Sequence, residues 1–172
     1  MIKTLLYFML ILSGASVYAQ SAVDTAGKQS PVRTLTYQQY EAYLKGQAGE
    51  DLAQVAEMNH YPLPDKVLKF KHELDLSPVQ IQKLTEASKY LHSRRLQIGG
   101  SVINTEKMLD SLFKSRQMDE GNLIFFTNRY GLYQGELKNA LLQACLSTEK
   151  LLSQKQMAKF ESLQKTPPNP PR

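Results

Sequence analysis

Three histidines are the residues of this chain best suited to hold a metal ion. His60 and His72 lie on either side of a predicted short helix, and His92 follows further along the chain. Glu73 adjoins His72, so an imidazole and a carboxylate stand together, and both are ligands of divalent transition metals. His60, His72 and Glu73 therefore form a tentative metal site. The alternative is that these side chains are ordinary exposed or partly buried groups.

A second set of residues combines positive charge with apolar surface, as a surface that holds non-native polypeptide must do. Cations attract an unfolded chain over a distance, and apolar groups then bind its side chains without a close fit. Phe125 adjoins Phe126, so one of the two rings must leave the helix contact and either pack between two copies or line a binding surface. Arg94 and Arg95 could equally pair with carboxylates on the same helix. The candidate client-binding residues are Lys89, Arg94, Arg95, Ile103, Lys107, Phe125, Arg129, Leu132 and Lys138.

Catalytic patterns are missing from the sequence. It contains no Gly-rich phosphate loop, nucleophile elbow or His-Glu-x-x-His zinc helix. The adjacent carboxylates Asp119 and Glu120 are explained by a helix start. Cys145 is the only cysteine and is expected to be a small buried hydrophobe, with an intermolecular disulfide or a reactive thiol as the alternatives. We expect a protein that is not an enzyme and requires no cofactor, with a divalent transition metal as the one ligand that the histidines allow.

Helical periodicity predicts the elements that position these residues. Four helices are expected, from about 64 to 73, from 78 to about 114, from 119 to about 151 and from 154 to about 164. The second carries apolar residues spaced by sevens, including Leu84, Leu91 and Ile98. Nowhere do apolar and polar residues alternate between turn residues, as a strand would require. The predicted fold class is all-α, a long antiparallel helical hairpin with short flanking helices.

Two of these helices begin with the same pattern. Leu76-Ser77-Pro78-Val79-Gln80 and Leu152-Ser153-Gln154-Lys155-Gln156 each place Gln three residues after Ser. In such a capping box the Ser oxygen accepts a bond from the Gln backbone amide, and the Gln side chain reaches back to the Ser amide. The helix-capping residues are therefore Ser77, Gln80, Ser153 and Gln156.

The first residues read as a secretory signal. Residues 1–19 combine Lys3, an apolar stretch and a small-residue cleavage site ending at Ala19. The apolar stretch is shorter than the roughly 20 residues needed to cross a bilayer, and no later segment is long enough. We expect a soluble periplasmic protein with no membrane span.

The remaining chain divides by composition. Residues 20–61 are expected to be a flexible N-terminal segment holding one short helix near 36–45, and residues 166–172 a Pro-rich disordered tail. Residues 62–165 form the helical domain and carry 16 Lys and Arg against 11 Asp and Glu. A basic protein commonly binds nucleic acid, but export removes that partner and leaves acidic or unfolded polypeptide, or a solvated surface without a ligand.

The paired motifs, with the export signal, resemble the periplasmic Spy/CpxP family and its CnrX-type heavy-metal sensors, whose hallmark is a repeated Leu-Thr-x-x-Gln motif. Here both copies carry Ser for Thr, which keeps the capping hydroxyl, and the stretch 56–64 resembles the sensor-like branch. The resemblance covers roughly residues 56–165. It implies an ATP-independent holdase chaperone or envelope-stress accessory protein that binds unfolded envelope proteins or a sensor partner. The alternative it implies is a periplasmic nickel, cobalt, zinc or copper sensor or resistance protein, with an anti-sigma partner.

Length favours a second copy of the chain. Each long helix would extend roughly 50 Å, and a lone hairpin of that length covers each helix on one side only. The family resemblance likewise implies an antiparallel, cradle-like homodimer. Gly99 and Gly135 would face each other across the hairpin, so we expect close approach or curvature of the helices there.

Overall fold

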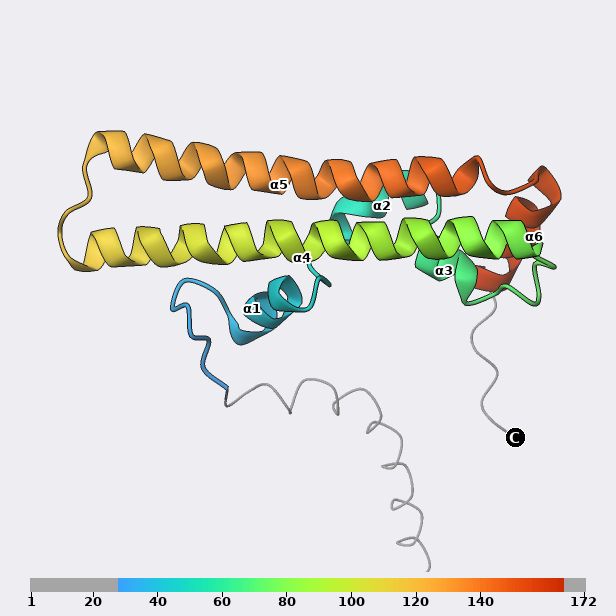
Figure 1. Cartoon of the computed structure of the whole chain (residues 1–172), viewed down its shortest axis with the longest axis horizontal. Coiled ribbons are helices and arrows are strands. Elements are labelled where there is room, and N and C mark those ends of the chain that lie inside the picture. Colours follow the sequence, from blue (N-terminus) through green and yellow to red (C-terminus); the bar gives the residue numbers. More distant parts are fainter. Residues whose placement is uncertain (1–27, 166–172) are drawn as a thin grey trace, which may run out of the picture.

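The computed structural model describes residues 28–165 of the chain. Within that range every regular element is a helix, and the all-α class is confirmed for it. The long helices α4 and α5 run side by side in opposite directions, and the short elements flank them (Figure 1). The predicted signal peptide 1–19, residues 20–27 and the tail 166–172 lie outside the described residues. The elements are α1 (Tyr37–Leu44), η1 (Glu50–Ala53), α2 (Gln54–Glu57), α3 (Pro64–Leu68), α4 (Pro78–Lys114), α5 (Glu120–Glu149) and α6 (Gln154–Lys165).

The long helices begin where the sequence predicts. The Ser77 oxygen accepts from the Gln80 backbone amide at 3.2 Å, and the Ser77 amide donates to the Gln80 side chain at 2.9 Å. Pro78 occupies the first turn, where its missing N–H leaves no bond unmade. Asp119 caps α5 by accepting from the Asn122 amide at 2.6 Å. Local sequence therefore fixes both starts of the hairpin.

The middle of the hairpin holds the largest core cluster. Ile98 and Val102 of α4 pack with Leu137 and Leu141 of α5, and each is at most 2% exposed. Burying a side chain of this size stabilises the fold by about 1.5–3 kcal/mol. Cys145 is fully buried in the same cluster, which confirms it as a small core hydrophobe. Burial raises the pKa of its thiol to about 11.

A second cluster closes the end of the hairpin where α3 and α6 lie. Leu74, Leu76, Leu84 and Phe160 are buried there together with Val67. The helix predicted over 64–73 is wrong in its length, because α3 ends at Leu68. The residues that follow form successive turns instead, which bring Leu74 and Leu76 into this cluster.

The N-terminal segment differs from the expected flexible chain over residues 28–61. α1 packs against α4, and η1 packs against α5. Ala53 is fully buried, and Ala48 is 9% exposed. Gly46 and Gly49 adopt positive φ angles of 63° and 82°, which only glycine takes readily, and so turn the chain from one long helix to the other. Buried Val32 and Leu35, small side chains and glycine turns together hold this segment close to the long helices.

The predicted contact between Gly99 and Gly135 is wrong. A Cβ atom built on Gly99 would lie 2.5 Å from the backbone oxygen of Tyr43, so this glycine makes room for α1 and not for α5. Gly135 has no heavy atom within 4 Å of such a Cβ. The physical reason is that α1 packs against α4 at Gly99, a contact between distant segments that no local sequence pattern indicates.

Candidate functional site

The two capping motifs meet in space. The Gln80 side chain donates to the side-chain oxygen of Gln156 at 2.9 Å and to the backbone oxygen of Leu151 at 2.7 Å. Gln156 in turn donates to the Gln80 side chain at 3.2 Å and to the backbone oxygen of Leu74 at 3.3 Å. We call this reciprocal pair the glutamine clasp. It ties the start of α6 to the start of α4, so the repeated motif has a structural role here.

A third capping box escaped the sequence analysis. Thr36 and Gln39 exchange the same two bonds at the start of α1, at 2.9 and 3.1 Å. Leu35-Thr36-Tyr37-Gln38-Gln39 matches Leu-Thr-x-x-Gln without any substitution, so the signal was present in the sequence. The short helix predicted near 36–45 is present as α1, but only the copies of the motif at Ser77 and Ser153 were recognised.

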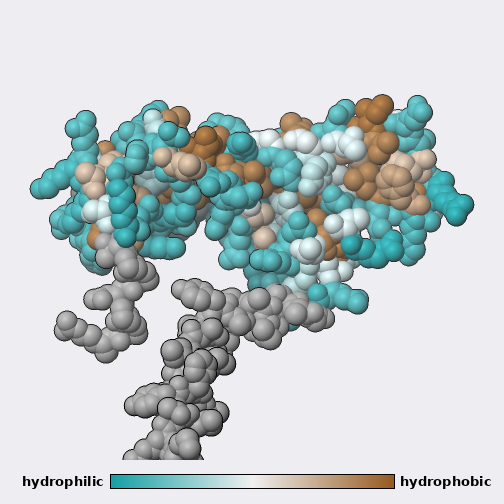
Figure 2. All heavy atoms as spheres, turned by 180° about the vertical axis from the view of Figure 1, so that it is seen from behind, coloured by the Kyte–Doolittle hydropathy of each residue, from teal (hydrophilic) through white to brown (hydrophobic). Residues whose placement is uncertain are grey.

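Large apolar side chains are exposed around the turn between α4 and α5. Figure 2 shows hydrophobic surface at this end of the molecule, on the right of the view. α1, α3 and α6 lie elsewhere along the hairpin (Figure 1), so the helix ends near the turn pack mainly on each other. We define the tip surface as Met108, Phe113, Leu123, Ile124, Phe125 and Leu132, whose exposed fractions range from 40% to 60%.

Phe125 is held on the outside of α5 by its neighbours. Its ring packs edge-on against Phe126, with centroids 5.1 Å apart. The Arg129 guanidinium lies 5.3 Å from the centroid of the Phe125 ring and 5.7 Å from that of Tyr133. Arg129 also donates to the Tyr133 hydroxyl at 2.8 Å. A cation over an aromatic face stabilises this arrangement, so an exposed ring and a positive charge are presented together.

Six of the nine predicted client-binding residues are exposed. Lys107, Arg129 and Lys138 are exposed, as are Phe125 and Leu132 on the tip surface. Lys89 is exposed too, but it lies 25 residues before the end of α4, roughly 38 Å along the helix at 1.5 Å per residue.

Two of the predicted residues are buried, which corrects their assignment. Ile103 is 6% exposed and packs against Val32 and Leu35. Arg95 is 9% exposed and donates from Nε to the backbone oxygen of Ala48 at 3.0 Å. Burial lowers the pKa of Arg95, and its Nη2 atom has no hydrogen-bond partner among the described residues. Both residues are covered by the N-terminal segment, whose packing the sequence did not indicate.

Several acidic groups beside the tip surface already have partners. Asp110 forms an ion pair with Arg33 at 2.5 Å, and Glu106 accepts from the Thr34 hydroxyl at 2.6 Å.

Arg94 is half-buried and lies 3.6 Å from Glu136 on α5, a partner that the sequence analysis did not name.

The candidate metal ligands do not assemble. Within residues 28–165 no three His, Cys, Asp or Glu side chains lie close enough together to hold an ion. His60 instead pairs with Glu161 of α6, with Nδ1 2.8 Å from the carboxylate oxygen. His72 and Glu73 are exposed in the turns after α3.

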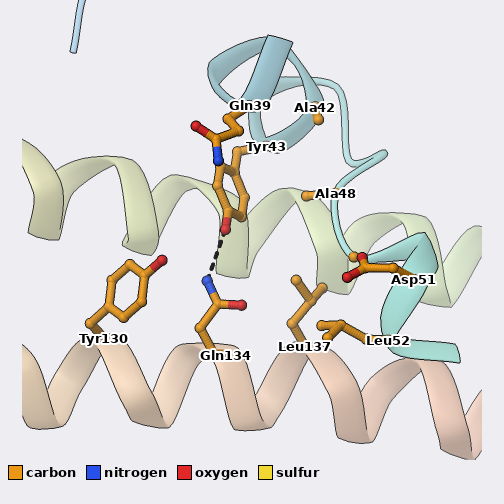
Figure 3. Close-up of a pocket in the computed structure, with 10 residues that line it drawn as sticks. Gln39, Ala42, Tyr43, Ala48, Asp51, Leu52, Tyr130, Gln134 and Leu137 are labelled. Carbon is orange, nitrogen blue, oxygen red and sulfur yellow. Dashed lines mark hydrogen bonds between the residues drawn. The ribbon is translucent and has the colours of Figure 1, made fainter. Parts of the chain in front are cut away.

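A cavity of about 290 Å³ lies between the N-terminal segment and α5. Figure 3 shows Tyr43 reaching from α1 toward α5, where its hydroxyl accepts from the Gln134 side chain at 2.8 Å. Burial raises the pKa of Tyr130 beside it. The lining residues are Gln39, Ala42, Tyr43, Ala48, Gly49, Asp51, Leu52, Tyr130, Gln134 and Leu137.

No helix within residues 28–165 is both long and apolar enough to cross a membrane. Comparison of the chain with protein-family models, with curated proteins and with solved structures finds no match.

Proposed function

We propose that this protein is a periplasmic, ATP-independent holdase chaperone or envelope-stress accessory protein, which binds non-native proteins or a sensor partner on the tip surface. The observation that carries the proposal is the gathering of six large apolar side chains, each at least 40% exposed, at one end of the hairpin. Exposed apolar patches on a protein commonly serve as interaction sites.

The chemistry of the tip surface suits a partner without a fixed shape. Phe125 and Leu132 offer apolar contacts, and Arg129 adds a positive charge directly beside the Phe125 ring. Exposed Lys107 and Lys138 extend the positive charge along both helices. Such a surface attracts acidic or unfolded chains by charge and retains them by apolar contact, which requires no close fit.

Suppression of aggregation tests the proposal. The double variant Phe125→Ser plus Leu132→Ser should lose most of the protection that the wild type gives to heat-denatured citrate synthase, measured by light scattering. Val55 and Met58 are 55% and 72% exposed near α2, so Val55→Ser plus Met58→Ser is a matched control that should protect like the wild type. Unchanged scattering with excess wild-type protein, or equal loss in both double variants, would reject the tip surface as the binding site.

We further propose that two copies associate in antiparallel fashion to form a cradle. Support comes from the hairpin itself, because α3 and α6 cover only one end of it, and the tip surface stays exposed although Arg33 and Thr34 contact α4 beside it. Sedimentation equilibrium across a dilution series tests this state, and a compact monomer at every concentration would exclude it. Repeating the measurement on Phe125→Ser plus Leu132→Ser separates the two roles of these residues. A variant that stays dimeric but no longer protects assigns them to client binding.

A further inference from the structure

Residues 32–53 form a strap that crosses the hairpin on one side. Its helix α1 lies against α4, and its η1 turn lies against α5 (Figure 1). Tyr43 spans the gap between the two long helices to reach Gln134 (Figure 3). The strap therefore covers a surface to which α4 and α5 both contribute.

The surface beneath the strap includes residues that the sequence placed on the client-binding surface. Ile103 is covered by Val32 and Leu35, and Arg95 is engaged by the backbone of Ala48. At its beginning the strap reaches Asp110 through Arg33, four residues before the end of α4 and beside the tip surface. The covered surface and the tip surface are thus neighbours along the same helix.

The strap enters the central cluster with small side chains, although Val32 and Leu35 at its start are buried against Ile103. Its fully packed members of the central cluster are Ala48 and Ala53, whereas the large side chains come from the hairpin and the segment leading into α3. The buried residues of the base cluster around Leu84 and Phe160 include none from the strap, and neither does the glutamine clasp. The hairpin thus has its own closure at the base, independent of the strap.

The polar contacts of the strap differ in burial: the Arg95–Ala48 bond is buried, the Gln134–Tyr43 bond is partly buried and the Arg33–Asp110 pair is exposed. The Arg33 side chain in the Arg33–Asp110 pair is 65% exposed, and exposed ion pairs stabilise a fold only weakly. The cavity beside Tyr43 leaves part of the contact between strap and α5 unfilled. Three glycines mark close contacts between strap and hairpin: a Cβ atom would lie 2.5 Å from the Tyr43 oxygen at Gly99, 3.0 Å from Leu96 at Gly46 and 2.9 Å from Leu137 at Gly49.

We propose that the strap is an intramolecular cover, and that non-native protein competes with it for the apolar groove between α4 and α5. This inference rests on the proposed holdase function and enlarges the surface that carries it. When the strap swings away, Ile103, which Val32 and Leu35 cover, and the part of Leu137 that lies against Gly49 become available to the client next to the tip surface. The strap thereby limits binding in the resting protein.

Two neighbouring glycines of α4 supply the test. In Gly99→Ala the new methyl group would lie 2.5 Å from the Tyr43 oxygen, a backbone atom that can yield only if α1 moves. In Gly100→Ala the methyl group meets nothing within 4 Å, so the strap stays in place. Both variants make the same chemical change in the same helix. Tyr43→Phe, which removes the bond to Gln134, loosens the strap without altering α4.

Hydrogen exchange and aggregation assays on the full chain give the readouts. In Gly99→Ala the backbone amides of residues 32–53 should exchange hydrogen faster than in wild type, while those around the base cluster should not. Gly99→Ala should also suppress citrate synthase aggregation at a several-fold lower protein dose than Gly100→Ala. Tyr43→Phe should change both readouts in the same direction by a smaller factor.

Three results would overturn the inference. The first is that hydrogen exchange of residues 32–53 is the same in Gly99→Ala as in wild type. The second is that the faster exchange extends to the base cluster around Leu84 and Phe160. The third is that the strap exchanges faster but Gly99→Ala needs the same dose as Gly100→Ala to suppress aggregation. A lack of protection by wild type, Gly99→Ala and Gly100→Ala alike would instead reject the proposed function, and this inference with it.

Discussion

The glutamine clasp predicts a measurable coupling between two residues far apart in the sequence. Replacing Gln80 by Ala removes its bond with the Ser77 amide, its bond to the Leu151 oxygen and its reciprocal contact with Gln156. A typical hydrogen bond contributes about 1 kcal/mol net, so we expect Gln80→Ala to lower the free energy of unfolding by about 2–3 kcal/mol. Gln156→Ala should cost a similar amount, because its contacts mirror these.

The double variant distinguishes a clasp from two separate caps. The contact between the two glutamines is lost in either single variant, so the double variant should cost about 1 kcal/mol less than the sum of the two. Urea unfolding followed by circular dichroism at 222 nm measures all three values. Gln82→Ala is the matched control, because Gln82 is exposed on α4 and bonds only to Glu86 of its own helix. Its loss should stay below about 0.5 kcal/mol.

Strict additivity of Gln80→Ala and Gln156→Ala would refute the reasoning, since independent caps would then account for the whole effect. A loss in Gln82→Ala as large as in Gln80→Ala would refute it too. That result would show that any glutamine in the first turns of α4 matters equally, whatever its partners.

Four other outcomes are expected. Arg95→Met should lower the free energy of unfolding by at most about 1.5 kcal/mol in urea titrations, because it removes the buried Nη2 without a partner together with the bond to Ala48. Arg95→Ala also leaves a cavity, so it should lower the free energy of unfolding by about 2–4 kcal/mol. Gly135→Ala should raise it by about 0.5–1 kcal/mol, since the methyl group meets nothing within 4 Å in a helix interior. The raised pKa of Cys145 gives a contribution to stability that is complete below pH 9 and is lost as the pH rises from 9 toward about 11, so wild type should lose stability more steeply than Cys145→Ala over that interval. Zinc or nickel should leave the melting temperature unchanged, since no third His, Cys, Asp or Glu within residues 28–165 joins His60 and Glu161; a rise that disappears in His60→Ala would support the heavy-metal alternative.

Much of the fold could be predicted because it is encoded locally. The capping box at Ser77 and the cap at Asp119 fix the starts of α4 and α5. Leu84, Leu91 and Ile98, which recur every seven residues, identify the buried side of α4. These signals need only neighbouring residues, so a single sequence shows them.

The packing of residues 28–61 depends on contacts that no local pattern shows. Ala48 and Ala53 are small residues that reveal nothing of burial, and Gly99 reads as a helix defect until Tyr43 is seen against it. That omission explains the errors in the candidate site. Arg95 and Ile103 lie on α4 at positions that would be exposed in a bare hairpin, and the strap buries both. Phe125 and Leu132, which the strap does not reach, remain exposed.

The clasp lies at one end of a molecule whose turn lies at the other. The two long helices are therefore joined at both ends, by side-chain bonds at Gln80 and Gln156 and by the chain itself through residues 115–119. Local opening of such a hairpin has to begin along its length, since neither of its ends can part while the clasp holds.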